Sequence, residues 1–93
     1  YGHEEPVYVY FYSIHCGACA LLKEDVLSFI RDYEEVLNLY ILDAYDVVDP
    51  VENLPNVVPA FLLIEDGSIK EAYKGIPAVQ NEIERLIFRN PLN

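Results

Sequence analysis

The apolar residues in the first half of the chain form short continuous runs and one stretch with helical spacing. Residues 7–12 are a run of β-branched and aromatic side chains after Pro6, which is typical of a buried strand. From Cys16 to about Tyr33, apolar residues recur every three or four positions between charged ones, which predicts an amphipathic helix. A second apolar run at 37–42 predicts another strand. A strand, helix and strand of this length are typical of a right-handed crossover between parallel strands.

The second half carries a hairpin signal and then a helix. Two β-rich runs, 60–64 and 69–73, flank an Asp-Gly pair, which is the strongest short-range indication of an antiparallel hairpin. Pro77 suits the first turn of a following helix, because its missing N–H is not needed there. Apolar residues then follow at helical spacing until Asn90, where the pattern stops.

This order of elements predicts the fold class and the domain organisation. It is a βαβ unit followed by ββα, so the chain is predicted to be α/β, with a four-stranded mixed sheet flanked by helices. The acidic segment 43–56 between the two halves contains two prolines and predicts only a short helix near 47–54. A chain of 93 residues with 53% apolar residues predicts one domain over 1–93, with its core at about 7–88.

Charge and composition exclude several classes of partner. The net charge is −10, with six scattered Lys and Arg residues, which argues against a nucleic-acid surface. The longest apolar runs are about a third of the ~20 residues that a membrane-spanning helix needs. We therefore expect a monomer without nucleic-acid or membrane contacts. Two cysteines exclude a disulfide-dense secreted scaffold, and one reversible pair fits either a reducing or an oxidising compartment, with the cytoplasm slightly favoured.

The candidate chemistry lies at the start of the first predicted helix. Cys16 and Cys19, separated by Gly17 and Ala18, come directly after the first predicted strand. Free backbone N–H groups at a helix N-terminus favour a thiolate over a thiol, so we expect Cys16 to be the reactive sulfur. Cys19 lies one turn deeper on the same side, close enough to attack a mixed disulfide at Cys16. The pair therefore predicts a redox switch.

A second motif strengthens this interpretation. The segment Val57-Val58-Pro59 precedes a predicted strand and the Asp-Gly turn. With the CxxC pair and the order of elements, it resembles the thioredoxin-like superfamily in its short form, without the additional N-terminal strand and helix of thioredoxin itself. The resemblance implies a thioredoxin-like fold and a thiol–disulfide oxidoreductase without cofactor or metal. It also implies electron transport and a role in cell redox homeostasis.

The resemblance assigns roles to individual residues. It implies that Cys16 is the attacking thiol, Cys19 the resolving thiol and Pro59 a cis proline packed opposite the pair. The backbone of Val58 would then pair with an extended substrate segment. The implied partners are protein disulfides or dithiols, and a reductase or other redox partner that resets the pair.

Several positions differ from the thioredoxin pattern. Tyr10 stands where the family has a buried Asp that helps to deprotonate the resolving thiol, and Leu39 stands where a Lys partner is found. His15 replaces a Trp, and Ala18 replaces a Pro between the cysteines. Ala18 offers no charge or hydrogen bond to the thiolate, which favours a reductant or a balanced exchanger over a strong oxidant.

Gly17 and Ala18 between the cysteines, and His15 and Tyr12 beside them, are further candidate substrate contacts. Two of these residues also have a plainer interpretation. His15, when protonated, would favour the neighbouring thiolate, but it could equally be an exposed loop histidine. Tyr12 is nearest the predicted site and a candidate substrate contact, whereas tyrosines that alternate on a strand mostly fill the core.

Other functions remain open at this stage. The CxxC pair could be structural in a thioredoxin-fold interaction module. A soft-metal or copper carrier also places a CxxC at a strand-to-helix junction, but the chain has no Met before the motif. A structural zinc site usually takes four ligands, more than one CxxC and His15 supply. The acidic residues at spacing near three in 43–56 are better explained as a solvated face, so no metal is predicted there.

Overall fold

The computed structural model describes residues 6–47 and 54–91. Every strand and both long helices predicted from the pattern are present, with bounds that differ by one or two residues. The predicted short helix near 47–54 falls mainly on residues outside the described ones. The elements are β1 (Val7–Tyr12), α1 (Gly17–Tyr33), β2 (Asn38–Asp43), the 3₁₀ turn η1 (Ala44–Asp46), β3 (Ala60–Glu65), β4 (Ser68–Lys74) and α2 (Ile76–Arg89).

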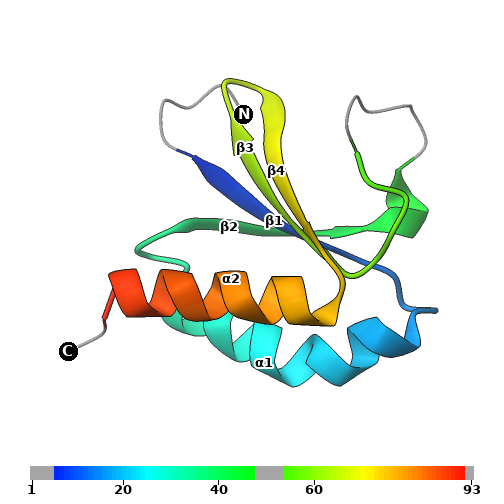
Figure 1. The fold of residues 1–93 in the computed structure, drawn as a ribbon, viewed down its shortest axis with the longest axis horizontal. Coiled ribbons are helices and arrows are strands. Elements are labelled where there is room, and N and C mark those ends of the chain that lie inside the picture. Colours follow the sequence, from blue (N-terminus) through cyan, green and yellow to red (C-terminus); the bar gives the residue numbers. More distant parts are fainter. Residues whose placement is uncertain (1–5, 48–53, 92–93) are drawn as a thin grey trace.

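The four strands form one mixed sheet in the order β2-β1-β3-β4. β1 and β2 are parallel, and β1 pairs antiparallel with β3, which pairs antiparallel with β4. The predicted βαβ and ββα halves are thus joined through the central pair β1–β3. Figure 1 shows that α1 and α2 lie side by side on the same side of the sheet. The α/β class and the mixed sheet are confirmed.

The central strand β1 is buried on both faces. Tyr8 and Tyr10 face the helices, whereas Val7, Val9 and Phe11 face the other side, as the two-residue period of a strand requires. This explains why the strand appears in the sequence as a continuous apolar run. The helix-side core is a single cluster of buried residues: Tyr8, Tyr10, Leu22, Val26, Phe29, Tyr33, Phe61, Val79, Ile83 and Leu86.

The opposite face of the sheet is closed partly by the chain between β2 and β3. Ala44, Val47, Leu54 and Val58 pack as partly buried residues against the buried apolar side chains of this face. After this segment, β3 starts beside the end of β1, where Ala60 pairs with Phe11, and α1 begins at the same end of the sheet (Figure 1). The covering of this face therefore also positions the candidate site.

The β3–β4 turn has the geometry that its Asp-Gly pair predicts. Asp66 has φ 54° and Gly67 has φ 77°, so both central residues adopt the left-handed conformation. A two-residue hairpin turn of this kind matches the twist of the flanking strands. Glycine and aspartate are among the residues that reach this conformation at least cost.

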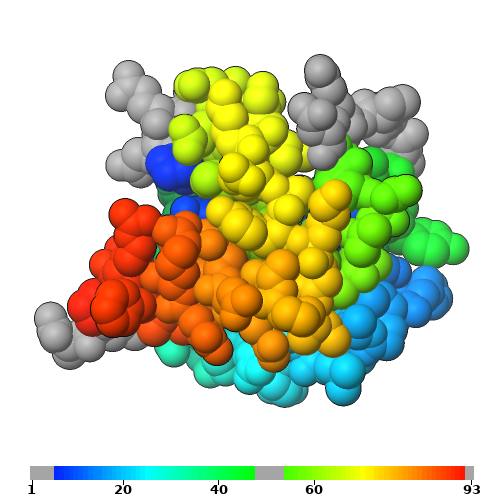
Figure 2. All heavy atoms as spheres, in the orientation of Figure 1, coloured from blue at the N-terminus to red at the C-terminus, as the bar shows by residue number. Residues whose placement is uncertain are grey.

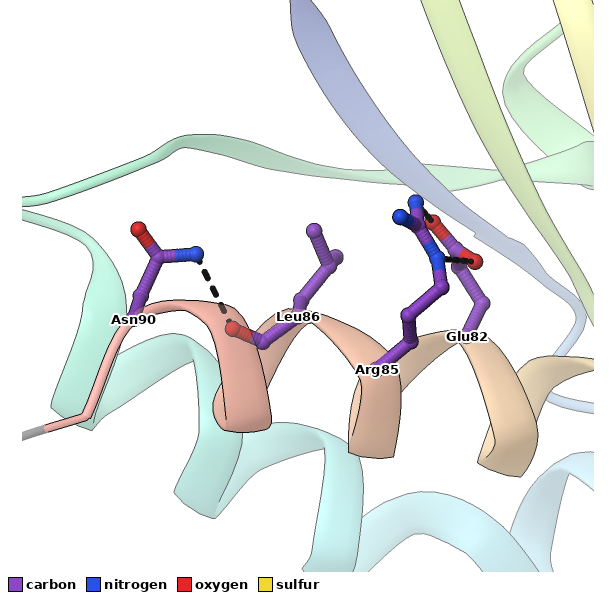
Figure 3. Close-up of polar contacts among 4 residues, drawn as sticks. All are labelled: Glu82, Arg85, Leu86 and Asn90. Carbon is purple, nitrogen blue, oxygen red and sulfur yellow. Dashed lines mark hydrogen bonds and ion pairs between the residues drawn. The ribbon is translucent and has the colours of Figure 1, made fainter.

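Helix α2 is held by an ion pair and a side-chain cap, both visible in Figure 3. Glu82 is only 4% exposed, and its carboxylate accepts hydrogen bonds from Arg85, one of them 2.7 Å from Nε to Oε1. At the end of the helix, the amide of Asn90 donates to the carbonyl of Leu86 at 2.9 Å. A buried carboxylate is costly without such a partner, so Arg85 stabilises the packed form of α2.

Two further properties of the described residues concern membrane and metal contacts. Neither α1 nor α2 has the length and apolar character needed to cross a membrane. Within residues 6–47 and 54–91, no three His, Cys, Asp or Glu side chains are grouped as metal ligands would be.

Candidate active site

Cys16 is the N-cap of α1. Its backbone is extended, with φ −100° and ψ 115°, and its Sγ accepts a hydrogen bond from the backbone N of Cys19 at 3.1 Å. Serine, threonine or aspartate usually fills this position, because an N-cap side chain must accept from an N–H of the first turn. Here a sulfur has that role. Negative charge on it would be stabilised by this N–H and by the helix dipole.

The two thiols differ in exposure. Cys16 is partly exposed, whereas Cys19 is 5% exposed, and both are free. Burial, with a smaller contribution from the Cys16 side chain, raises the pKa of the Cys19 thiol from 9.0 to about 11. Only about one Cys19 side chain in ten thousand is then a thiolate at pH 7. Cys16 is consequently the sulfur that an external disulfide can reach, and Cys19 is a protonated thiol behind it.

The loop before the helix positions Cys16 through backbone contacts. The N–H of Cys16 donates to the carbonyl of Ser13 at 3.1 Å, and the N–H of His15 donates to Ser13 Oγ at 3.2 Å. His15 is exposed, and its ring packs against that of Tyr45, with 5.5 Å between the centroids. This contact holds the imidazole on the loop after β2.

The segment before β3 forms a second wall of the site. The Val58–Pro59 peptide bond is cis, and the carbonyl oxygen of Val58 lies 3.7 Å from Cys16 Sγ, which donates to it. The carbonyl of Pro59 accepts from the N–H of Gly75 at 2.9 Å, which ties this segment to the start of α2. Pro59 is itself fully buried. Forty-two residues of sequence thus separate Cys16 from the carbonyl that it contacts.

A pocket of about 310 Å³ lies on the other side of the thiols, between β1, β2 and the first turns of α1. Both sulfur-bearing residues line it, together with Tyr10 and Tyr12, whose rings stack at 5.9 Å. Lys23 is the cationic residue among those that line it. The pocket gives the buried Cys19 an open side.

The thioredoxin family model matches residues 2–88 of the chain. The chain belongs to the thioredoxin family. Since the match covers nearly all of the sequence, membership rests on both halves of the fold and not on the CxxC pair alone. It supports thiol–disulfide redox function in general. No curated protein sequence matches the chain.

Solved thioredoxin structures have the same fold as this family member. Plasmodium falciparum thioredoxin has a TM-score of 0.70 and 24% identity, covering 90% of this chain and 84% of that one. The thioredoxin NaTrxh of Nicotiana alata has a TM-score of 0.69 and 24% identity, with 94% and 74% covered. Oxidised mitochondrial thioredoxin 3 of Saccharomyces cerevisiae has a TM-score of 0.68 and 21% identity, with 90% and 81% covered. The thioredoxin-like fold predicted from the sequence is confirmed.

Most of the residues predicted from sequence as a candidate site lie close together in the structure. Cys16, Cys19 and the Val58–Pro59 segment lie together, and Tyr12 lines the adjoining pocket. Gly17 is exposed and Ala18 partly exposed in the first turn of α1. A Cβ at Gly17 would meet no atom within 4 Å, so the glycine is not needed for space.

Sequence reasoning missed two residues of this site. Ser13 holds the loop with both its carbonyl and its hydroxyl, and Tyr45 packs on His15. A serine three residues before a helix cap is a weak signal for the first. The contact of Tyr45 depends on how the loop after β2 folds back, and no local pattern predicts it.

Proposed function

We propose that this thioredoxin-family protein is a thiol–disulfide oxidoreductase that exchanges two electrons with disulfides or dithiols of partner proteins through Cys16 and Cys19. The observation that carries the proposal is the asymmetry of the pair. An accessible sulfur accepts an N–H at a helix N-terminus, and a buried protonated thiol lies one turn behind it. An attacking and a resolving thiol need these two environments.

The reaction requires only sulfur chemistry. The Cys16 thiolate attacks one sulfur of a partner disulfide, forming a mixed disulfide and releasing the other partner sulfur as a thiolate that takes up a proton. Cys19 then loses its proton and attacks Cys16 Sγ. The Cys16–Cys19 disulfide forms, the second partner sulfur leaves as a thiolate, and the partner has gained two electrons. A reductase or another dithiol resets the pair by the reverse steps, and no organic cofactor or metal enters the proposal.

The surface around Cys16 supports protein partners. Ile14 is 70% exposed and Tyr45 is 74% exposed, and Val57 is also exposed next to the Val58–Pro59 segment. Figure 2 shows the blue atoms of the β1–α1 loop adjoining the green atoms of the chain between β2 and β3 at one edge of the molecule. Exposed apolar side chains around a reactive atom favour contact with another protein surface. The backbone of Val58, with Pro59 behind it, is proposed to align an extended partner segment.

Replacement of Cys19 by Ser tests the proposal. In this variant Cys16 should form stable mixed disulfides with a model protein disulfide such as that of native insulin, because the resolving thiol is absent. The Cys16→Ser variant, which keeps the buried thiol, is the matched control and should trap almost nothing. Equal trapping by the two variants, or none by either, would contradict the assigned roles.

The rate of alkylation separates this function from a structural CxxC pair. Iodoacetamide should modify Cys16 at mildly acid pH much faster than it modifies free cysteine, since the N-terminal N–H groups of α1 stabilise the thiolate. Equal rates would favour an interaction module whose cysteines are only structural. Stoichiometric Cu(I) in protein purified under reducing conditions would instead favour soft-metal carriage.

A further inference from the structure

The hydroxyl of Tyr10 is a buried polar group that the fold leaves without a partner. Tyr10 lies on the helix-facing side of β1 and is 5% exposed. Among the residues that the structure describes, no atom forms a hydrogen bond with its hydroxyl oxygen. Buried hydroxyl groups nearly always have a partner, because desolvation without one is unfavourable. The exception therefore calls for a functional explanation.

This hydroxyl belongs to the residues around the two sulfurs. Tyr10 lines the same pocket as Cys16 and Cys19. Burial, and then the negative charge that Cys19 and Cys16 carry when ionised, raise the pKa of Tyr10 to about 12. The phenol consequently keeps its proton across the physiological range and can donate a hydrogen bond, but it cannot serve as a base at neutral pH.

Among the residues that the structure describes, few other side chains can act on Cys19. The titratable and charged side chains that face it or share its pocket are Cys16, Tyr12 and Lys23. The strands beside β1 present apolar partners at the register of Tyr10, Ile41 from β2 and Phe61 from β3. Helix α2 contributes apolar residues to the core around Tyr10, namely Val79, Ile83 and Leu86. Its charged pair, Glu82 and Arg85, acts on Tyr8 and Tyr73 instead. Among the backbone groups near the Cys19 sulfur, that of Ser13 forms a hydrogen bond that favours the ionised form, but the pKa of Cys19 is still raised to about 11. The backbone N–H of Cys19 itself donates to Cys16 Sγ.

We propose that the Tyr10 hydroxyl is the hydrogen-bond donor of the resolving step, and that it stabilises the Cys19 sulfur as this thiol loses its proton. The inference rests on the proposed function. The proton passes to water in the pocket, the Cys19 thiolate attacks Cys16 Sγ, and the partner sulfur leaves and takes up a proton. In the resting thiol form the donor and the sulfur need not be in contact, because such hydrogen bonds often shorten only when charge develops.

A donor and a base at this position have different consequences for pH dependence. A carboxylate would accept the proton itself, so resolution would level off once that base is ionised. A phenol leaves the proton to solvent, so the rate of resolution should rise about tenfold with each pH unit through the neutral range. The slope of this profile therefore distinguishes a donor from a base, and comparison with Tyr10→Phe distinguishes a donor from a residue that only packs.

Reaction of the reduced protein with Ellman's reagent, an aromatic disulfide, reports the two steps separately. The first thionitrobenzoate released measures attack by Cys16, and the second measures resolution by Cys19. In Tyr10→Phe the first rate should stay unchanged. The rate of the second release should fall about threefold at neutral pH. Loss of the hydrogen bond reduces the thiolate fraction of Cys19 about tenfold, but the more basic thiolate is a better nucleophile and offsets part of this loss. Tyr8→Phe, a tyrosine of the same strand and face, is the control and should alter neither rate.

Each outcome has a definite meaning. A second rate that is unchanged in Tyr10→Phe, or a first rate that falls equally, overturns the inference while leaving the proposed function intact. A native protein that releases no second thionitrobenzoate contradicts the proposed function itself. Because Phe removes a hydroxyl that lacks a partner, Tyr10→Phe should melt at or above the native temperature, and a clearly lower melting temperature also overturns the assignment.

A second variant tests the inference if Tyr10→Phe does not fold. Fluorotyrosine introduced at position 10 by stop-codon suppression keeps the ring and strengthens the hydroxyl as a donor. It should accelerate the second release and leave the first unchanged. A second rate that stays the same or falls counts against the inference.

Discussion

The buried thiol of Cys19 should make the stability of the reduced protein fall at alkaline pH. Its pKa is about 11 in the folded protein and 9.0 as the ordinary value, which we take for the unfolded chain. Below pH 9 both forms hold the proton, so the full stability is present. Between pH 9 and pH 11 only the unfolded chain loses it, so each rise in pH favours unfolding.

The size of the effect follows from the two pKa values. At pH 8 the loss is below about 0.1 kcal/mol, because both forms are almost fully protonated. At pH 10 the unfolded thiol is mostly ionised and the folded thiol is not, which costs about 1.4 kcal/mol. With a urea dependence of about 1 kcal/mol per molar for a domain of this size, the midpoint of unfolding should shift by roughly 1.4 M.

Urea unfolding of the reduced native protein and of Cys19→Ala measures this directly. The smaller core side chain of the Ala variant changes the free energy of unfolding by an amount that does not depend on pH, so any pH dependence of the difference comes from titration of Cys19. Cys16 and the tyrosines are present in both proteins, so their titration largely cancels in the difference. The difference between the two free energies of unfolding should therefore shrink by about 1.4 kcal/mol from pH 8 to pH 10. A difference that stays constant over this range would mean that Cys19 ionises as readily in the folded protein as in the unfolded chain, and would refute the reasoning about the resolving thiol.

Three further predictions concern the scaffold. Replacement of Arg85 by Met should lower the free energy of unfolding by about 1–3 kcal/mol in urea titrations, because it leaves the buried Glu82 carboxylate unpaired, and adding Glu82→Gln should restore part of the loss. Gly67→Ala should lower the free energy of unfolding by about 1 kcal/mol in thermal unfolding, because Gly67 has a left-handed φ. Gly17→Ala should be neutral or stabilising, because Gly17 is helical and has open space around it, and equal costs for the two variants would contradict this explanation. Cys16→Ala should lose about 1 kcal/mol of helix-cap stabilisation, whereas Cys16→Ser should retain it. The Ala variant should therefore melt at a lower temperature than the Ser variant.

Much of the fold could be predicted because its elements are specified by local patterns. The run at 7–12 predicts β1, the Asp-Gly pair predicts the β3–β4 turn, and Pro77 with the apolar spacing predicts α2; each depends on neighbours within a few residues. The segment 43–56 could not be assigned in the same way, since its acidic residues and prolines match no single period. The structure describes only its two ends, with a 3₁₀ turn at Ala44–Asp46.

The sequence by itself determined the class of chemistry at this site. Cys16 comes after a buried strand, where the helical pattern begins, so a sulfur near the free N–H groups of the first turn is predicted from order along the chain alone. The second cysteine, three residues on, must then lie one turn deeper on the same side.

Tertiary structure alone decided what surrounds the two sulfurs. The approach of the Val58 carbonyl to Cys16 and the burial of Cys19 depend on strand register and on both helices packing against one face. The same packing leaves the Tyr10 hydroxyl without a partner among the described residues. These contacts join residues far apart in sequence. Hydrophobic periodicity specifies which face of an element is buried, but not which atom lies opposite it.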